Sequence, residues 1–253
     1  AFIAYRLLAA LQIDDRQSSK HQGKRAVVIG LLVVGSTVGE RVQHRSDAAA
    51  LRSHDSGDAT HAQRTSLKRV TDSPRVSAPG VRKTANSPER IAAIVRANDL
   101  IVTAIVHTHA HLDHVFATAA VKQAHGGSVC LHPGDRPLYD GVAVQAAMFG
   151  WAPPPMTAVE RWLDDGETLR FGAHGALVVH TPGHTPGSVC FEIAAPGERT
   201  RLFAGDTLFR RSVGRTDLPG GDAGRLRRSI QDKLYTRDLD AVVIPGHGPT
   251  TTL

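Results

Sequence analysis

Four side chains that can bind a metal ion stand close together in the segment 108–114, which reads THAHLDH. An apolar run rich in β-branched residues, Leu100 to Val106, leads into this segment and predicts a buried strand. Beyond His114, apolar residues recur at helical spacing. We therefore expect the polar cluster on a loop where a strand ends and a helix begins, between two rigid elements. Imidazole and carboxylate groups together suit zinc, iron or manganese.

Three later turns each place one histidine or aspartate beside glycine, after a short apolar run. They read TPGHTPG (181–187), FAGD (203–206) and IPGHG (244–248). Glycine lets the backbone turn sharply and approach a site closely. Satisfied histidines in a core would not recur in this turn context, so a metal site is the better interpretation. The chain then offers seven candidate ligands: His109, His111, Asp113, His114, His184, Asp206 and His247.

The four motifs, in this order and spacing, resemble the metallo-β-lactamase superfamily. The segment 214–222, GRTDLPGGD, resembles the glyoxalase II-like branch of that superfamily, in particular its short bacterial members. The resemblance extends from Ser87 to Leu253. It implies an α+β fold of the superfamily's αβ/βα sandwich type, with the metal site at one edge of the two sheets.

The resemblance also implies a role for each candidate ligand around two divalent metal ions, with zinc expected first and iron or manganese as alternatives. The first ion would be held by His109, His111 and His184, and the second by Asp113, His114 and His247. Asp206 would bridge the two ions. Asp113 is also the catalytic candidate, because it would orient the hydroxide that the ions share. Arg215 and Asp217, in the GRTD segment, are the candidates for substrate binding.

Two metal ions that share a hydroxide provide a nucleophile near neutral pH and stabilise the oxyanion of acyl transfer. The expected reaction is therefore hydrolysis of an activated acyl compound. The resemblance implies a glutathione thioester such as S-lactoylglutathione, which would make the protein a hydroxyacylglutathione hydrolase. Three alternatives stay open: a glutathione persulfide dioxygenase with a single iron, a lactonase of the same superfamily, and a non-enzyme whose site is not formed.

The positive charge of the chain is confined to its first third. Residues 1–90 carry 15 Lys and Arg against 8 Asp and Glu, whereas residues 91–253 carry 15 against 16. The basic part lacks interleaved aromatic residues and any nucleic-acid motif, so no nucleic-acid partner is expected. No apolar run reaches the length of about 20 residues that a membrane span needs. The two cysteines do not suggest a disulfide framework, and we expect a cytoplasmic protein.

The N-terminal third does not match the family. The superfamily usually opens with a hairpin and a strand that ends in an Asp-Pro-Gly turn, and neither is legible before Ser87. Either the apolar run Ala26–Val34 supplies the opening strands, or residues 1–86 are not the native partner of the rest. The expected domains are therefore 1–86, an atypical basic segment that is disordered or non-native, and 87–253, the catalytic domain.

From Ser87 onward the periodicity predicts alternating helices and strands. The expected helices are 87–97, 114–125, one within 135–149, and 222–235. The expected strands are 100–107, 128–132, 167–171, 176–181, 188–193, 201–205 and 240–244.

Overall fold

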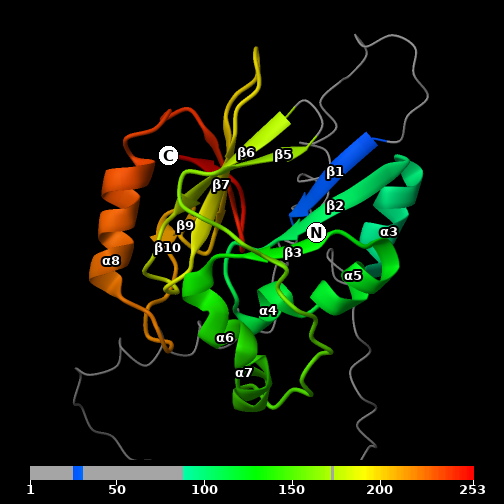
Figure 1. The fold of residues 1–253 in the computed structure, drawn as a ribbon. Coiled ribbons are helices and arrows are strands. Elements are labelled where there is room, and N and C mark those ends of the chain that lie inside the picture. Colours follow the sequence, from blue (N-terminus) through cyan, green and yellow to red (C-terminus); the bar gives the residue numbers. More distant parts are fainter. Residues whose placement is uncertain (1–24, 31–87, 172–173) are drawn as a thin grey trace, which may run out of the picture. The chain divides into compact units, whose positions relative to one another are not determined.

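The computed structural model describes residues 25–30 and 88–253, apart from 172–173. Contacts divide the chain into one unit of residues 1–35 and 85–253 and a second unit of residues 36–84, which lies outside the described residues. The described part of the first unit contains two larger sheets with helices on their outer faces (Figure 1). This arrangement confirms the predicted sandwich.

The first sheet is parallel throughout. In sheet order its strands are β1 (Arg25–Gly30), β2 (Leu100–Val106), β3 (Ser128–Leu131) and β4 (Arg161–Trp162). Parallel neighbours need a crossover, and a helix supplies it between β2 and β3. The helices that cover this sheet are α3 (Pro88–Ala97) and α5 (Thr118–His125). Ile91 and Val95 of α3 and Val121 of α5 pack with Val102 and Ile105 of β2.

The second sheet is mixed, with β8 and β11 parallel and the other neighbours antiparallel. In sheet order its strands are β12 (Thr251–Thr252), β11 (Val242–Pro245), β8 (Arg201–Gly205), β7 (Val189–Ile193), β6 (His174–His180) and β5 (Thr168–Phe171). Its outer face is covered by α8 (Ala223–Arg228), which continues as a π-helical segment, η2 (Ser229–Leu234).

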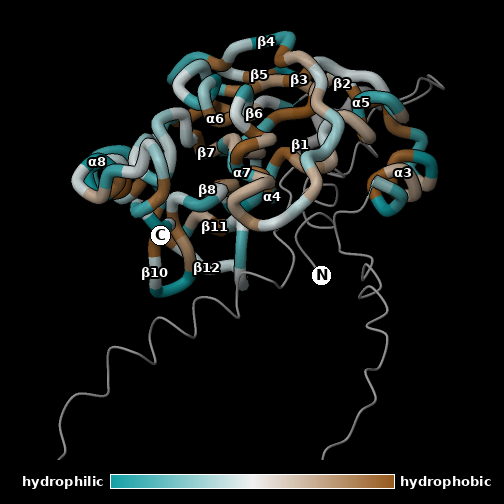
Figure 2. Tube along the Cα trace, turned by 90° about the horizontal axis from the view of Figure 1, so that it is seen from below, coloured by the Kyte–Doolittle hydropathy of each residue, from teal (hydrophilic) through white to brown (hydrophobic). Residues whose placement is uncertain are grey.

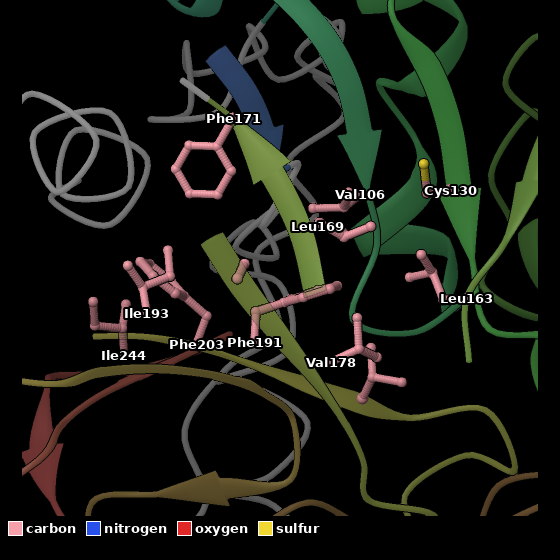
Figure 3. Close-up of a cluster of buried hydrophobic side chains, with 12 residues drawn as sticks. Val106, Cys130, Leu163, Leu169, Phe171, Val178, Phe191, Ile193, Phe203 and Ile244 are labelled. Atoms are coloured by element: carbon pink, nitrogen blue, oxygen red, sulfur yellow. The ribbon is translucent and has the colours of Figure 1, made fainter. Parts of the chain in front are cut away.

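Successive side chains along the strands of the second sheet belong to two different hydrophobic cores, one on each face of the sheet. Val178 and Phe203 pack between the sheets, whereas their neighbours Val179 and Leu202 pack under α8 and η2. Successive side chains of a strand point to opposite faces, so a continuous apolar run is what a strand covered on both faces requires. Figure 3 shows the inner core, in which Phe203 and Phe191 lie on one side and Val106 on the other.

Short elements gather at one end of the sheets. They are α4 (Leu112–Val115), the 3-10 turn η1 (Pro133–Asp135), α6 (Arg136–Asp140), α7 (Val142–Met148) and the hairpin of β9 (Leu208–Phe209) and β10 (Ser212–Val213). Figure 2 looks onto this end, with α4 and α7 near the centre of the view. The polar motifs of the sequence occur on and around these elements.

The predicted elements are present, although the helix expected within 135–149 is divided into α6 and α7 and the helix expected over 222–235 becomes π-helical from Ser229. The helix after β2 differs in a more informative way. The helix predicted over 114–125 begins two residues earlier, as α4, and is interrupted before α5. It begins early because the backbone amides of His114 and Val115 bond to the carbonyl of His111, which makes the end of the 108–114 segment the first turn. It is interrupted where the Thr118 hydroxyl donates to the Val115 carbonyl at 2.7 Å, a local bond that competes with the helical ladder.

Strand β1 comes from the N-terminal third that the sequence left ambiguous. It pairs in parallel with β2, from Arg25 opposite Leu100 to Gly30 opposite Val106, with one irregularity in the register. One strand of the Ala26–Val34 run is thus part of the first sheet, as the first of the two alternatives expects. The other residues of 1–86 lie outside the described residues, and the domain boundary at residue 86 stays a prediction.

Two further features concern the cysteines and the helices. Cys130 and Cys190 are free thiols, both buried, and burial raises the pKa of each to about 11. Among the described residues, no helix combines the length and the apolar character that a bilayer crossing requires.

The pairing of β1 predicts slow amide exchange at residues 25–30. Paired edge amides exchange more slowly than those of an unfolded peptide, because exchange requires the strand to open. Hydrogen–deuterium exchange with peptide-level mass spectrometry should show protection at least about tenfold over an unstructured reference. The central strand β3 provides the internal standard. Exchange of 25–30 at the unstructured rate would contradict the pairing.

Candidate metal centre

Three histidine nitrogens meet where the 108–114 loop faces the turn after β6. His184 Nε2 lies 2.9 Å from His111 Nδ1 and 3.2 Å from His109 Nε2. All three rings are buried, with exposed fractions of 9% or less. His184 Nδ1 lies 2.7 Å from the Arg215 carbonyl, which can only accept, so Nδ1 carries the proton. His184 Nε2 therefore directs its lone pair at the other two rings.

A second group of side chains lies beside the first. His247 Nε2 is 3.2 Å from Asp113 Oδ2, and His114 Nε2 is 3.6 Å from the same oxygen. Asp113 and His114 come from α4, whereas His247 comes from the turn after β11. These three side chains offer two nitrogens and one oxygen within the reach of a single ion.

Asp206, in the turn after β8, lies between the two groups. Its Oδ2 atom is 3.7 Å from His184 Nε2 and 3.4 Å from His247 Nε2, and its Oδ1 atom is 3.5 Å from His114 Nε2. One carboxylate therefore contacts ligands of both groups. The two oxygens of a single carboxylate can serve two ions in this way.

The electrostatics keep the first group neutral. Burial lowers the pKa of His111 to about 3 and also lowers the pKa values of His109 and His184, and the neighbouring rings add to the effect at His109 and His111. A neutral imidazole has a lone pair free for a metal. At His114 burial acts in the opposite direction to two carboxylates, Asp113 and Asp206, which together raise its pKa. The negative charge that favours a proton at His114 equally favours a cation.

The donor set fits metal ions on two independent observations. First, ligands at about 2.0–2.1 Å in a tetrahedral zinc site lie about 3.3–3.4 Å apart, close to the spacing seen among the histidine nitrogens. Second, both His114 Nε2 and Asp206 Oδ1 are buried without a hydrogen-bond partner. Buried polar atoms are nearly always paired, so orphaned atoms that face one another indicate a ligand between them.

Gly246 allows the last turn to approach this closely. A Cβ atom at this position would lie far inside van der Waals contact with Asp206 Oδ1 and 2.9 Å from His114 Cε1. Position 246 therefore requires glycine because a side chain has no room there, and not because of its backbone conformation. The turn after β11 can place His247 beside Asp206 only because residue 246 has no side chain.

The centre is open on one side. Asp113 and His247 have side chains exposed by 33% and 38%, whereas Asp206 is exposed by 12% and the remaining ligands by 9% or less. Phe209 of the β9–β10 hairpin lies edge-on to His247, with ring centroids 6.3 Å apart. We call the side that presents Asp113 and His247 the open face, because a substrate can reach the centre from there.

Arg215 and Asp217 lie at the surface and bind each other. The Arg215 guanidinium makes two hydrogen bonds of 2.7 Å to the Asp217 carboxylate. The backbone of Arg215 contacts the centre through His184, whereas its side chain is about half exposed. This geometry is that of a local ion pair on the loop whose backbone contacts His184.

Five other histidines of the described residues lie outside the metal-binding groups: His107, His125, His132, His174 and His180. His107 is buried beside the Thr118 hydroxyl, at 3.2 Å. His132 stacks on His180, with ring centroids 3.9 Å apart.

Sequence reasoning missed two polar residues that contact the 108–114 loop. The Asp135 carboxylate accepts from the backbone amide of Ala110, and the Gln145 side chain bonds to the backbone of Ala110 and Leu112. A signal for Asp135 was present, because it stands in a Pro-Gly turn after strand β3, the same context as the other polar residues. Gln145 had no such signal, since it lies within a helical segment.

Comparison with known proteins gives a consistent result. The sequence model of the metallo-beta-lactamase superfamily matches residues 79–247. A hydroxyacylglutathione hydrolase, GloC of Haemophilus influenzae, is 35% identical over 167 residues, which cover 65% of this chain and 77% of that protein.

Two solved structures share the fold. The B3 metallo-beta-lactamase BLEG-1 has a TM-score of 0.60 at 34% identity and covers 66% of this chain and 80% of its own. TTHA1623, solved in a di-iron-bound form, has a TM-score of 0.56 at 42% identity over 66% of this chain and 81% of its own. A family match over most of the chain, the shared fold and the clustered histidines agree, and the chain belongs to the metallo-β-lactamase superfamily.

Proposed function

We propose that this protein is a binuclear metal-dependent hydrolase that cleaves a thioester, with a glutathione thioester as the substrate. The observation that carries the proposal is Asp206, whose two oxygens face ligands of both histidine groups. A single-ion site would need only one of these groups. TTHA1623, a structural neighbour that holds two iron ions, supports the same number.

Each candidate ligand has a place in this proposal. His109, His111 and His184 would hold one ion, Asp113, His114 and His247 the other, and Asp206 would bridge them. Two divalent ions at such a centre supply the positive charge that lowers the pKa of a water molecule and stabilises the oxyanion of acyl transfer. Zinc suits this ligand set, and iron or manganese suits it as well.

The protein's own residues would prepare and orient the reactants. Asp113 is the ligand carboxylate on the open face, and it would hold the hydrogen of the attacking oxygen. Burial opposes the charged form of Asp113, but His114 and His247 outweigh this and hold the pKa of the carboxyl below its ordinary value. Asp113 is therefore ionised at neutral pH and can accept that hydrogen.

Two observations favour a glutathione thioester. GloC of Haemophilus influenzae, 35% identical over 167 residues, is a hydroxyacylglutathione hydrolase by name. Arg215 places a guanidinium on the loop that contacts His184, and glutathione carries carboxylates that such a group can bind. To bind a substrate carboxylate, the Arg215 guanidinium would have to leave Asp217 or bind both carboxylates. An exposed ion pair allows this, because such pairs contribute only about 0–1 kcal/mol to stability.

The bridging role predicts the metal content of variants. Asp206→Ala should lose both ions, because it removes the only ligand that both would share. His184→Ala should weaken mainly the first ion and leave about one ion per chain. Elemental analysis of purified protein measures this, with Asp217→Asn as a control that should retain the wild-type content. Two ions per chain in Asp206→Ala would refute the bridge, and a single iron in the wild type would favour the dioxygenase alternative.

The two glycines of the last turn form a matched pair. Gly246→Ala should displace the Asp206 carboxylate and reduce the metal content, because the new Cβ occupies its space. Gly248→Ala meets open space and is strained only by its φ of 77°. It should cost about 1 kcal/mol of unfolding free energy and keep its metal. Metal analysis alongside chemical denaturation separates the two effects, and equal metal loss in both variants would contradict the steric explanation.

Substrate class is tested with a panel of thioesters. The wild type should hydrolyse S-lactoylglutathione with a higher kcat/KM than thioesters of simple thiols, and it should act on lactones poorly. Arg215→Ala should lower kcat/KM for glutathione thioesters by about tenfold or more, the effect of one hydrogen bond to a charged group. Thioesters that lack carboxylates should change little. A uniform loss over the whole panel would mean that Arg215 only stabilises the loop.

A further inference from the structure

We propose that Asp135 and Gln145 form a clamp that holds the backbone of the metal-binding loop, and that the clamp sets how tightly and in what geometry the first ion is bound. Both residues follow β3, on a segment that supplies none of the proposed ligands. They act through the backbone and touch neither the ion nor the substrate, so they are positioning residues. The inference rests on the proposed metal centre but not on the thioester substrate.

Asp135 joins the two loops that carry the ligands of the first ion. Its Oδ2 atom accepts from the Ala110 amide and from the Thr185 hydroxyl, each at 2.8 Å. Its Oδ1 atom accepts from the Gly187 amide at 2.6 Å. Ala110 stands between His109 and His111, and Thr185 follows His184. A single carboxylate therefore ties the backbone between His109 and His111 to the turn that carries His184, through the Thr185 hydroxyl and the Gly187 amide.

Gln145 holds the next two peptide groups along the loop. Its Nε2 atom donates to the Ala110 carbonyl at 3.0 Å and to the Leu138 carbonyl at 2.8 Å, and its Oε1 atom accepts from the Leu112 amide at 3.0 Å. Asp135 thus binds the amide of Ala110, and Gln145 binds its carbonyl. The peptide groups on both sides of His111 are fixed by side chains from one segment.

The packing around Asp135 shows that this contact is built into the fold. Asp135 is completely buried, and its three hydrogen-bond donors are all uncharged. A buried carboxylate is costly unless hydrogen bonds satisfy it. A Cβ atom on Gly187 would lie 2.8 Å from Asp135 Cβ, so the two turns are as close as a glycine allows. The exposed Asp140, on the neighbouring α6, has no such surroundings.

The functional consequence follows from the histidine geometry. A rotation of the peptide groups beside His111 would move its Nδ1 atom away from His184 Nε2, which is now 2.9 Å away. Ligands held in place bind an ion more tightly than ligands that must be ordered on binding. Loss of the clamp should therefore weaken the first ion and change its coordination geometry.

The test uses the full chain loaded with cobalt(II), whose visible spectrum reports the coordination geometry. The variants are Asp135→Asn and Gln145→Met, and the control is Asp140→Asn, which changes an exposed aspartate of the same segment. Cobalt release into an excess of chelator should be about tenfold faster in both clamp variants, the usual size of such outer-shell effects. Their spectra should also change, while the control matches the wild type.

A role in folding alone gives a different result. It would lower the denaturation midpoint of the metal-free variants and leave the cobalt spectrum and the release rate unchanged, which would overturn the proposal. If Asp135→Asn does not fold, Gln145→Glu takes its place in the test. This variant keeps the acceptor for the Leu112 amide and loses the donor to the Ala110 carbonyl. Cobalt release should again be faster, and release at the wild-type rate would also refute the clamp. A wild type that binds cobalt but cleaves no thioester refutes only the substrate, whereas one that binds no cobalt refutes both proposals.

Discussion

The convergence of seven lone-pair-bearing side chains on one small volume is the constraint on which the rest of this structure depends. Burial lowers the pKa values of His109 and His111 and so keeps these rings uncharged, while His114 Nε2 and Asp206 Oδ1 are buried without hydrogen-bond partners. A buried polar atom without a hydrogen-bond partner destabilises the folded state by its desolvation free energy, and a bound cation can offset this cost. The protein therefore has to hold this set together through packing elsewhere, and a metal ion bound here would add its binding free energy to the stability of the folded chain.

The two sheets provide that packing. β2, β6, β8 and β11 each end directly before a polar turn, and the apolar side chains near these ends are buried on both faces, under helices or against the opposite sheet. Strands fixed on both sides cannot shift relative to one another without opening a core. The ends of the strands are consequently rigid points from which short glycine turns can place a histidine or aspartate with little freedom.

The candidate ligands differ in solvent exposure, and this difference separates the enclosed part of the centre from the part that a substrate can reach. His109, His114 and His184 are enclosed, whereas Asp113 and His247 are partly exposed and His247 lies beside Phe209. Enclosed ligands define the centre, and the open face leaves room for a substrate. The same division explains why the clamp residues lie on the enclosed side: there the backbone of the 108–114 loop can be fixed without obstructing access.

The sequence alone predicted the longer helices and strands from residue 87 onward and the identity of the clustered residues, because strand periodicity and Gly-rich turns are local signals; the two-residue strands β4, β9, β10 and β12 carry no such signal. It did not reveal Gln145, whose contacts join residues more than 30 positions apart, nor that the helix after β2 would begin within the metal-binding motif and be interrupted by Thr118. It also left open the use of Ala26–Val34, because one apolar run is compatible with several partners; only pairing with β2 assigned residues 25–30 to the first sheet. Tertiary structure decided these points, since each depends on which distant backbone groups come within hydrogen-bonding distance.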